Sequence, residues 1–457
     1  MASDSVFLAQ IQNGKPLIVY LHMIPKEEGI KYTDPHKFIR RISMSRKWQV
    51  VLVLCLAAAL LISFAGVPGA ADKKGKVLKI GTCNPLSGPT ALWGVSQRRC
   101  AELWAEDINA KGGLWVNGVR HPIELPRGDD QGLPEVARTV AERLINKDKV
   151  KFIIGPNIDT TYTAVREVCN PEKVIHFGAT FDPSNVGPDK PYSVLIMWMA
   201  HQTGPILYKY LIEKHGVKKM AWIQKDDPGG HMAVEMCMKS AKAMGIEVLD
   251  SAFFAQGTTD MYPQATKVLK GNPDVVDLPT ASPEEVGLAA KALRELGFKG
   301  MITEETEGDV EVTTGVAGAE YAEGIIFNAG SFDPVHASPE MKKYHEKFVK
   351  KFGVWNPDAP TKLYTSYMMG AAIQKAGTID DTDAVMKAFR AIQVKTPYLP
   401  GDEVIRAISQ KEFGINNQIG VPMCLAQIQK GKSVLVYTHL APKEQGITYT
   451  EPYKFVW

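Results

Sequence analysis

Polar or small residues stand at the ends of several short apolar runs of this sequence, where they could hold a small molecule. In the first half of the chain they carry hydroxyls, an indole, a carboxylate and backbone N–H groups, and in the second half mostly carboxylates. The candidate ligand-binding residues are Ser87, Trp93, Asp159, Thr160, Ala179, Thr180, Asp227, Ser282 and Glu305. Because hydroxyls and N–H groups hold polar atoms and carboxylates attract cations, this set predicts binding of a polar or dipolar solute, with its cationic end on the later residues.

Several of these residues also have a purely structural interpretation. Asp159 directly precedes a predicted helix over residues 162–169, so an N-cap alone would explain it. Asp227 is followed by Pro228-Gly229-Gly230, which is favourable turn chemistry. Trp93 would serve in a core as well as against a ligand. The sequence leaves both interpretations open for these positions.

Catalytic motifs are absent from the sequence. There is no GxSxG, HExxH or GxxxxGK[ST], and no GxGxxG after a predicted strand. Asp129 and Asp130 could act as an acid–base pair, but no nucleophile or set of metal ligands accompanies them. The six cysteines stand alone, without CxxC or zinc spacing, and are expected to be small buried hydrophobic residues. One disulfide is the alternative in an oxidising compartment. We therefore expect no enzyme activity, no catalytic residues, no metal and no cofactor.

Parallel sheets are the elements that would bring the candidate residues together. From Val77 onward, short β-branched runs alternate with helical patterns, and the rhythm restarts near Met199. The predicted fold class is α/β, with two doubly wound parallel-sheet lobes joined by a multi-strand hinge. Lobe 1 is expected to comprise residues 77–198 and 330–405, and lobe 2 residues 199–329 and 406–457. Ligands of such sheets bind beyond the carboxyl ends of the strands, where the candidate residues lie.

The N-terminal region is predicted to contain a signal peptide and a repeat of the C-terminal tail, and not a part of the folded lobes. Ser45-Arg46-Lys47, the apolar run Val50–Ile62 and a small-residue exit predict a signal peptide over residues 44–71. A membrane anchor and a core helix are the alternatives, although the run is shorter than the ~20 residues that a span prefers. Residues 8–38 repeat residues 425–455, with 20 of 31 positions identical by direct count. We interpret residues 1–43 as a non-native extension resembling the C-terminal tail, with Met44 as the functional start; the alternative is a true extension that adds a strand.

Charge and length narrow the class of protein further. The chain has 457 residues, which suits two or three domains, and a formal net charge of +3. Acidic and basic residues are interspersed, without the basic stripe and interleaved aromatics of a nucleic-acid binder. Nucleic acid is therefore not an expected partner.

Motifs along Val77–Val436 resemble the leucine/isoleucine/valine-binding protein family, the type I periplasmic receptors of ABC importers. The resembling segments are Ile80–Pro89, the helix from Gly94 that ends in Asp107–Gly113, Asp129-Asp130, Gly155-Pro156, Gly178–Thr180, Thr259–Met261 with Lys267, Pro273–Val276, Leu293–Gly300 and Ala322–Gly324. Each motif is weak, but their order and spacing together are specific. The resemblance implies a two-lobed clamp with three crossovers that closes on its ligand by hinge bending.

The resemblance also implies roles for single residues. Groups at Asp159 and Thr180 would hold an α-carboxylate, an acid near Glu305 would meet an ammonium, and the aromatic Trp93 would pack on the ligand side chain. The sequence departs from the family at three places, with Asp159 for a serine, Pro228 for an aromatic and Ser282 where tyrosine occurs. A carboxylate at Asp159 would repel a ligand carboxylate by about 1 to 4 kcal/mol at a separation near 4 Å. The fold is therefore more firmly implied than an amino-acid ligand.

The expected function is that of a periplasmic, monomeric solute-binding protein of an ABC importer. Its solute would be an amino acid or a related polar molecule such as an amide or an aromatic acid, and its partner a membrane permease. A ligand-binding sensor of the same fold is the alternative. A signal peptide without a later output domain favours the binding protein.

Overall fold

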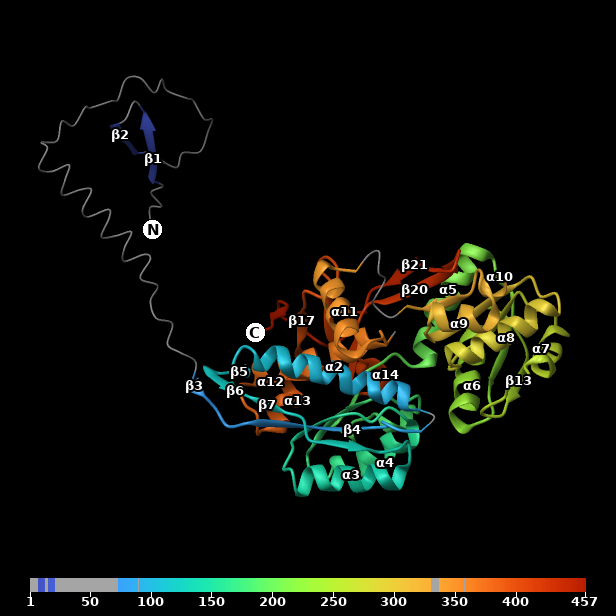
Figure 1. Ribbon diagram of the computed structural model, residues 1–457, viewed down its shortest axis with the longest axis horizontal. Coiled ribbons are helices and arrows are strands. Elements are labelled where there is room, and N and C mark those ends of the chain that lie inside the picture. Colours follow the sequence, from blue (N-terminus) through green and yellow to red (C-terminus); the bar gives the residue numbers. More distant parts are fainter. Residues whose placement is uncertain (1–6, 13–14, 21–72, 89, 330–336, 357) are drawn as a thin grey trace, which may run out of the picture. The chain divides into compact units, whose positions relative to one another are not determined.

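The computed structural model describes residues 7–12, 15–20, 73–88, 90–329, 337–356 and 358–457. The chain divides into two compact units, Met1–Ala71 and Asp72–Trp457 (Figure 1). The predicted signal peptide lies outside the described residues. Among the helices that are described, none combines the length and the apolar character needed to cross a membrane.

The first lobe of the larger unit is built on one large sheet (Figure 1). The strand order is β22-β17-β18-β19-β11-β10-β9-β4-β7, and β8 also pairs with β4. The strands are β4 (Leu78–Asn84), β7 (Ile123–Glu124), β8 (Arg127–Asp129), β9 (Phe152–Ile154), β10 (Ile175–Gly178), β11 (Ser193–Leu195), β17 (Gln393–Lys395), β18 (Val404–Ile408), β19 (Gln418–Gly420) and β22 (Tyr453–Lys454). Strands β4, β9, β10, β11 and β19 run parallel, so their carboxyl ends share one edge. Three short strands, β3 (Lys73–Lys74), β5 (Leu114–Val116) and β6 (Val119–His121), form a separate small sheet.

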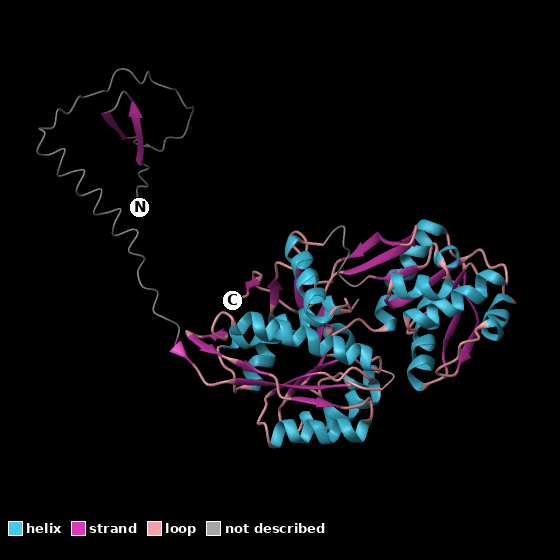
Figure 2. Cartoon of the chain, in the orientation of Figure 1, coloured by secondary structure: helices cyan, strands magenta, loops and turns pink. Residues whose placement is uncertain are grey.

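Helices cover both faces of this sheet (Figure 2). One face packs α3 (Pro134–Asn146) and α4 (Asp159–Cys169), whose apolar residues form one core cluster with the sheet. The other face packs α2 (Ala91–Asn109), α11 (Pro339–Phe352), α12 (Ala359–Ala376) and α13 (Thr382–Ala391). Helix α12 packs against both α2 and α13 and is buried over residues 359–374, including polar residues such as Lys362. Short turns η2 (Pro183–Asn185) and α14 (Gln410–Phe413) complete the lobe.

The second lobe repeats this architecture around a seven-stranded sheet. Its order is β13-β12-β14-β15-β16-β20-β21, and all pairs are parallel except those of β20, which is antiparallel to both β16 and β21. The strands are β12 (Lys219–Lys225), β13 (Glu247–Phe254), β14 (Val275–Leu278), β15 (Met301–Glu307), β16 (Ile326–Asn328), β20 (Met423–Gln429) and β21 (Lys432–His439). One face packs α7 (Tyr262–Leu269), α8 (Pro283–Glu295), α9 (Val310–Ala317) and α10 (Ala319–Ala322), the other α5 (Ala200–His215) and α6 (Pro228–Ala243). The predicted α/β class with two parallel-sheet lobes is confirmed.

The chain passes between the two sheets four times, once more than the resemblance implies. The passages follow β11, β16, β19 and β21, and the second includes residues 330–336, which are not described. The topology corrects the predicted lobe boundary at residues 405/406, because β18 pairs with β17 and β19 and stays in the first sheet. The tail also returns to the first lobe, where β22 pairs with β17 and Phe455 packs on the ring of Tyr367. A strand has the same pattern of apolar residues in either lobe, so the sequence alone does not show to which sheet it belongs. Its pairing partner decides this.

The repeated segment forms the same hairpin in both copies. In the second copy β20 and β21 pair with Gln429 opposite Lys432, and β20 also pairs with β16 of the second lobe. In the first copy β1 (Phe7–Gln12) and β2 (Lys15–Tyr20) pair with Gln12 opposite Lys15, as a two-stranded sheet. The interpretation of residues 1–43 as a non-native extension stays a prediction.

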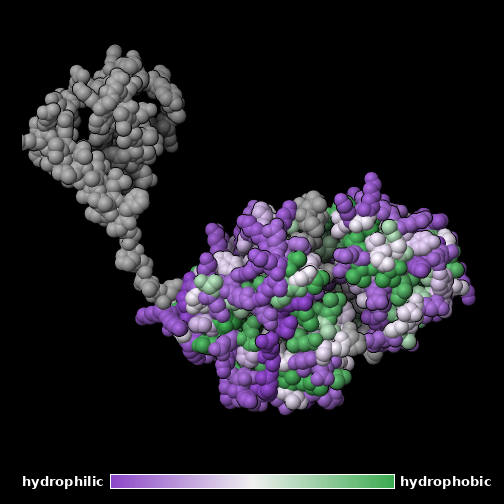
Figure 3. All heavy atoms as spheres, in the orientation of Figure 1, coloured by the Kyte–Doolittle hydropathy of each residue, from purple (hydrophilic) through white to green (hydrophobic). Residues whose placement is uncertain are grey.

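Polar residues cover most of the outer surface on the face drawn in Figure 3, with hydrophobic residues in patches between them. The large exposed hydrophobic side chains of the described residues come from both lobes and from widely separated elements. The described cysteines are all buried, as expected of small hydrophobes, while Cys55 lies outside the described residues; they are Cys83, Cys100, Cys169, Cys237 and Cys424.

Candidate functional site

A cavity lies where the two lobes meet beside the interlobe passages. It has an empty volume of about 480 Å³, counting space open to solvent. The first lobe contributes Phe181 and Thr361, the second lobe contributes Glu305, Glu307 and Asn328, and the passages contribute Trp198 and Pro422 among others. Thr361 donates a hydrogen bond to Glu307 Oε1 across the lobes at 3.2 Å. The position beyond the ends of β10, β15 and β16 is where open parallel sheets bind ligands.

Asp159 and Thr180, both predicted for the site, meet at the end of β10. Asp159 Oδ1 accepts hydrogen bonds from the Thr180 hydroxyl at 2.6 Å, the Phe181 N–H at 2.6 Å and the Asp182 N–H at 3.3 Å. The side chain makes no capping hydrogen bond to α4, where Asp159 is the first residue and Ile158 the N-cap. The structure thus excludes the N-cap explanation of Asp159.

None of the first-lobe candidates, including Asp159 and Thr180, is among the residues that line the cavity. Ser87 is exposed and donates to Asp129 Oδ2 at 2.7 Å. Trp93 is half-buried in the first turn of α2, and Thr160 is exposed in the first turn of α4. Ala179 packs in the hydrophobic core of the lobe, and its binding role stays a prediction. Among these candidates, only Asp159 and Thr180 contact one another through a hydrogen bond.

Two second-lobe candidates use their side chains as helix caps. Asp227 accepts from the Gly230 N–H at 2.6 Å at the start of α6. Ser282 and Glu285 form a capping box at the start of α8. Neither residue lines the cavity. The binding roles of both stay predictions, and the structure gives their side chains a local function.

Glu305 lines the cavity but belongs to a buried hydrogen-bonded cluster. It accepts from the Thr203 hydroxyl at 2.6 Å and from the Tyr208 hydroxyl at 2.9 Å, and Tyr208 also lies 3.2 Å from Asp277. Burial raises the pKa of Glu305 well above its usual range, and the neighbouring Asp277 raises it further. Burial likewise raises the pKa of Asp277. The hydroxyls of Thr203 and Tyr208 thus already occupy the Glu305 carboxyl, and its expected role as an ammonium partner stays a prediction.

Cys237, Asp277 and Glu305 have ligand atoms within 4.8 Å of one another. Hydroxyl donors already hold both carboxyl groups, since the Thr303 hydroxyl donates to Asp277 at 2.6 Å besides the bonds to Glu305. This arrangement is a satisfied buried polar cluster and supports no assignment of a metal.

Glu304 faces the other side of β15 and is also buried, so it does not extend the expected carboxylate surface. Burial raises the pKa of Glu304 to about 8, although the Thr306 hydroxyl, which donates at 2.8 Å, opposes the shift. A glutamate in an unfolded chain has a pKa of about 4.3. Between these values the folded state binds more protons than the unfolded state, so Glu304 lowers the stability increasingly as pH rises.

A Glu304→Gln variant should therefore gain stability relative to the wild type as pH rises from 5 to 8. Glutamine keeps the shape and a hydrogen-bond acceptor, and has no proton to lose. The quantity to measure is the melting temperature of the variant minus that of the wild type, because this difference cancels the other titrating groups. Glu320→Gln, at an exposed position on α10, is the control and should show a flat difference. A flat difference for Glu304→Gln as well would contradict the assignment.

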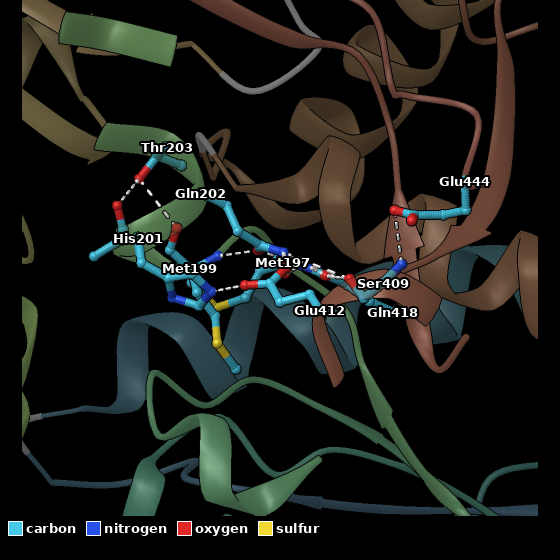
Figure 4. A network of polar contacts seen from close by, with 10 residues as sticks. Met197, Met199, His201, Gln202, Thr203, Ser409, Glu412, Gln418 and Glu444 are labelled. Carbon is cyan, nitrogen blue, oxygen red and sulfur yellow. Dashed lines mark hydrogen bonds and ion pairs between the residues drawn. The ribbon is translucent and has the colours of Figure 1, made fainter. Parts of the chain in front are cut away.

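A network of amides joins the passages beside the cavity (Figure 4). The side chains of Gln202 and Gln418 bond reciprocally, at 2.8 and 2.7 Å, and Gln418 also donates to the Met197 carbonyl at 2.6 Å. Gln202 and His201 both contact Glu412, and the Ser409 N–H donates to Glu444 at 3.0 Å. Gln202 at the start of α5 is therefore bonded to β19 and α14 of the first lobe, and Ser409 is bonded to Glu444 of the fourth passage. Thr203, the next residue on α5, donates to Glu305.

The sequence reasoning missed most residues that line the cavity. Asn328 follows a predicted strand, so the rule of strand ends could have found it. Trp198 and Thr203 lie at the predicted junction of the lobes. Thr361 lies within a buried helix, and Phe181 follows Thr180 with no distinct pattern, so nothing in the sequence marks either as cavity lining.

Comparisons with known proteins agree with this architecture. The sequence model of the periplasmic binding protein family matches residues 77–432. An amino acid binding protein of Pseudomonas aeruginosa is 27% identical over 314 residues, covering 67% of this chain and 80% of that protein. A leucine-, isoleucine-, valine-, threonine- and alanine-binding protein of the same species is 26% identical, covering 75% of this chain and 88% of that protein.

Solved structures show the same fold at lower identity. A leucine-binding protein of Thermotoga maritima superposes with a TM-score of 0.67 at 19% identity, covering 80% of this chain and 99% of that one. A solute-binding protein of an ABC transporter from Rhodopseudomonas palustris, in complex with 3,4-dihydroxybenzoic acid, superposes with a TM-score of 0.65 at 19% identity. The match covers 81% of this chain and 99% of that one. With a family model that spans both lobes and an interlobe cavity at the strand ends, the chain belongs to the periplasmic binding protein family.

Proposed function

We propose that this protein is an extracytoplasmic solute-binding protein of an ABC importer that captures an amino acid or a related small polar solute between its lobes. The observation that carries the proposal is the cavity lined by both lobes and by the passages between them. Its lining combines the rings of Phe181 and Trp198 with hydroxyl, amide and carboxyl groups. Apolar walls with a few placed polar groups are typical of small-molecule sites.

The bending of the passages would close the lobes on the solute. Side-chain hydrogen bonds join Gln202 at the start of α5 to Gln418 and Ser409 of the first lobe, beside those passages, so we expect the passages to bend together as one hinge. The closed clamp would then be presented to a membrane permease. Relatives named as amino-acid-binding proteins support this function, and the buried polar groups of the site are matched by one another rather than arranged around a nucleophile.

Thermal melting against a panel of amino acids, their amides and small aromatic acids should identify at least one stabilising solute. A ligand present at 100 times its Kd stabilises the folded state by about 2.7 kcal/mol. With about 2 to 4 °C per kcal/mol for a domain of 150 to 250 residues, the expected rise is roughly 5 °C or more. Calorimetric titration then gives the affinity. A panel that leaves the melting temperature unchanged throughout would contradict solute capture of this class.

A further inference from the structure

The end of β10 forms a site for a negative charge, and the chain fills it itself. Two successive backbone N–H groups, those of Phe181 and Asp182, converge with the Thr180 hydroxyl on one oxygen, Asp159 Oδ1. Successive N–H groups of this kind make a concavity that binds anions. Thr180 is buried, and its hydroxyl donates to Asp159 while it accepts from the Asn185 amide and the Asp182 N–H. The donors that could hold a solute carboxylate here are already in use.

The second oxygen of Asp159 faces the other lobe. Oδ2 accepts no hydrogen bond from the residues that the structure describes, and it lies 3.2 Å from the position a Cβ would take on Gly229 at the start of α6. Phe181, whose N–H holds Oδ1, also lines the interlobe cavity. Asp159 does not itself line the cavity, but its Oδ2 faces the second lobe beside it and accepts no hydrogen bond from the described residues.

No positive charge in the cavity would compensate a second carboxylate. The residues that line it include Glu305 and Glu307 but no lysine, arginine or histidine. Within the described part of the chain, Asp159 itself has no ion pair. Two carboxylates about 4 Å apart would repel by about 1 to 4 kcal/mol, which corresponds to a loss of roughly 5- to 1,000-fold in affinity.

We propose that the solute of this protein carries no carboxylate at the Asp159 end and instead presents N–H donors there, as a carboxamide or an amine does. Asp159 Oδ2 accepts a hydrogen bond from this head group, while Oδ1 keeps the donors of the β10 loop occupied. This inference rests on the proposed function and names the chemical class of its solute.

Probes with one carbon skeleton and different head groups test the proposal. Isovalerate, isovaleramide and isoamylamine share a branched chain, as do leucine and leucinamide. Their affinities would be measured by calorimetric titration for the wild type and for Asp159→Ser, with folding checked by circular dichroism. The wild type should bind the amide or the amine at least tenfold more tightly than the matching carboxylate. Asp159→Ser should gain at least tenfold in affinity for isovalerate and leucine, because the vacated donors now hold the solute carboxylate.

Two further variants separate the causes. Asp159→Asn keeps an oxygen on the same donors but removes the charge, so its gain for isovalerate should be smaller than that of Asp159→Ser. Asp189→Ser removes an exposed carboxylate outside the site and should change no affinity. The proposal is overturned if the wild type binds carboxylates as tightly as amides and amines, or if Asp159→Ser gains nothing. A wild type silent toward every probe contradicts the proposed function, whereas carboxylate binding gained only by Asp159→Ser still supports the role of Asp159.

Discussion

Lys362→Met should destabilise the protein by about 3 to 5 kcal/mol, because it leaves a buried carboxylate without its cation. Lys362 is 5% exposed on α12, its ammonium lies 3.9 Å from Asp358 Oδ2, and it donates to Asn157 Oδ1 at 2.8 Å. Asp358 is also buried and accepts from the Ser96 hydroxyl at 2.5 Å. At about 2 to 4 °C per kcal/mol, the melting temperature should fall by roughly 10 °C.

The substitution of Lys362 would also remove a contact that holds the loop leading to Asp159. Asn157 donates to Asn84 Oδ1 at 2.7 Å, so Lys362 ties the loop after β9, which leads to Asp159, to α12 and to the end of β4. Lys375→Met is the matched control, since Lys375 is exposed on the same helix and should change the stability by no more than about 0.5 kcal/mol. Adding Asp358→Leu to Lys362→Met should recover part of the loss, because both charges are then gone. Equal melting temperatures for Lys362→Met and Lys375→Met would show that the buried pair does not stabilise the lobe.

The order of the elements could be predicted from the sequence because local patterns determine it. The apolar runs ending at Asn84, Ile154 and Gly178 became adjacent parallel strands, with the polar candidates at their carboxyl ends. The course of the tail could not be predicted, because Val404–Ile408 would suit either sheet and only its pairing with β19 decides. The repeat of the tail at residues 8–38 was plain in the sequence, but which sheet the second copy joins was not.

The contacts of the site residues could not be predicted from the sequence, mainly because it does not show which way each side chain points. Asp159 and Thr180 were both predicted to face a ligand, yet they bond to one another, because the start of α4 and the end of β10 meet in three dimensions. Glu305 was predicted as a charged partner, but Thr203 and Tyr208 on α5 enclose it. By contrast, the capping box of Ser282 and Glu285 is local and could have been assigned from its four-residue spacing alone.

Gly229→Asp should abolish or strongly weaken solute capture without unfolding the protein. Gly229 is the second residue of α6, where a carboxylate suits the helix N-terminus, so the fold should tolerate it. In the arrangement described here its Cβ would lie 3.2 Å from Asp159 Oδ2, and the added carboxylate would face Asp159 across the lobes. Repulsion of about 1 to 4 kcal/mol at a separation near 4 Å would oppose closure, so we expect the affinity for the solute found in the panel to fall at least tenfold.

The size and the charge of the new side chain can be separated by titrating three variants at this position with the same solute. Gly229→Ala adds only the Cβ, which a shift of a few tenths of an ångström can accommodate, and should cost the least affinity. Gly229→Asn adds the bulk of aspartate without its charge and should fall between Gly229→Ala and Gly229→Asp. Gly315→Asp places the same charge on α9, where a Cβ meets nothing within 4 Å, and should leave binding unchanged. If Gly229→Asp binds the solute as tightly as Gly315→Asp does, then Asp159 and α6 do not approach one another when the clamp holds its ligand.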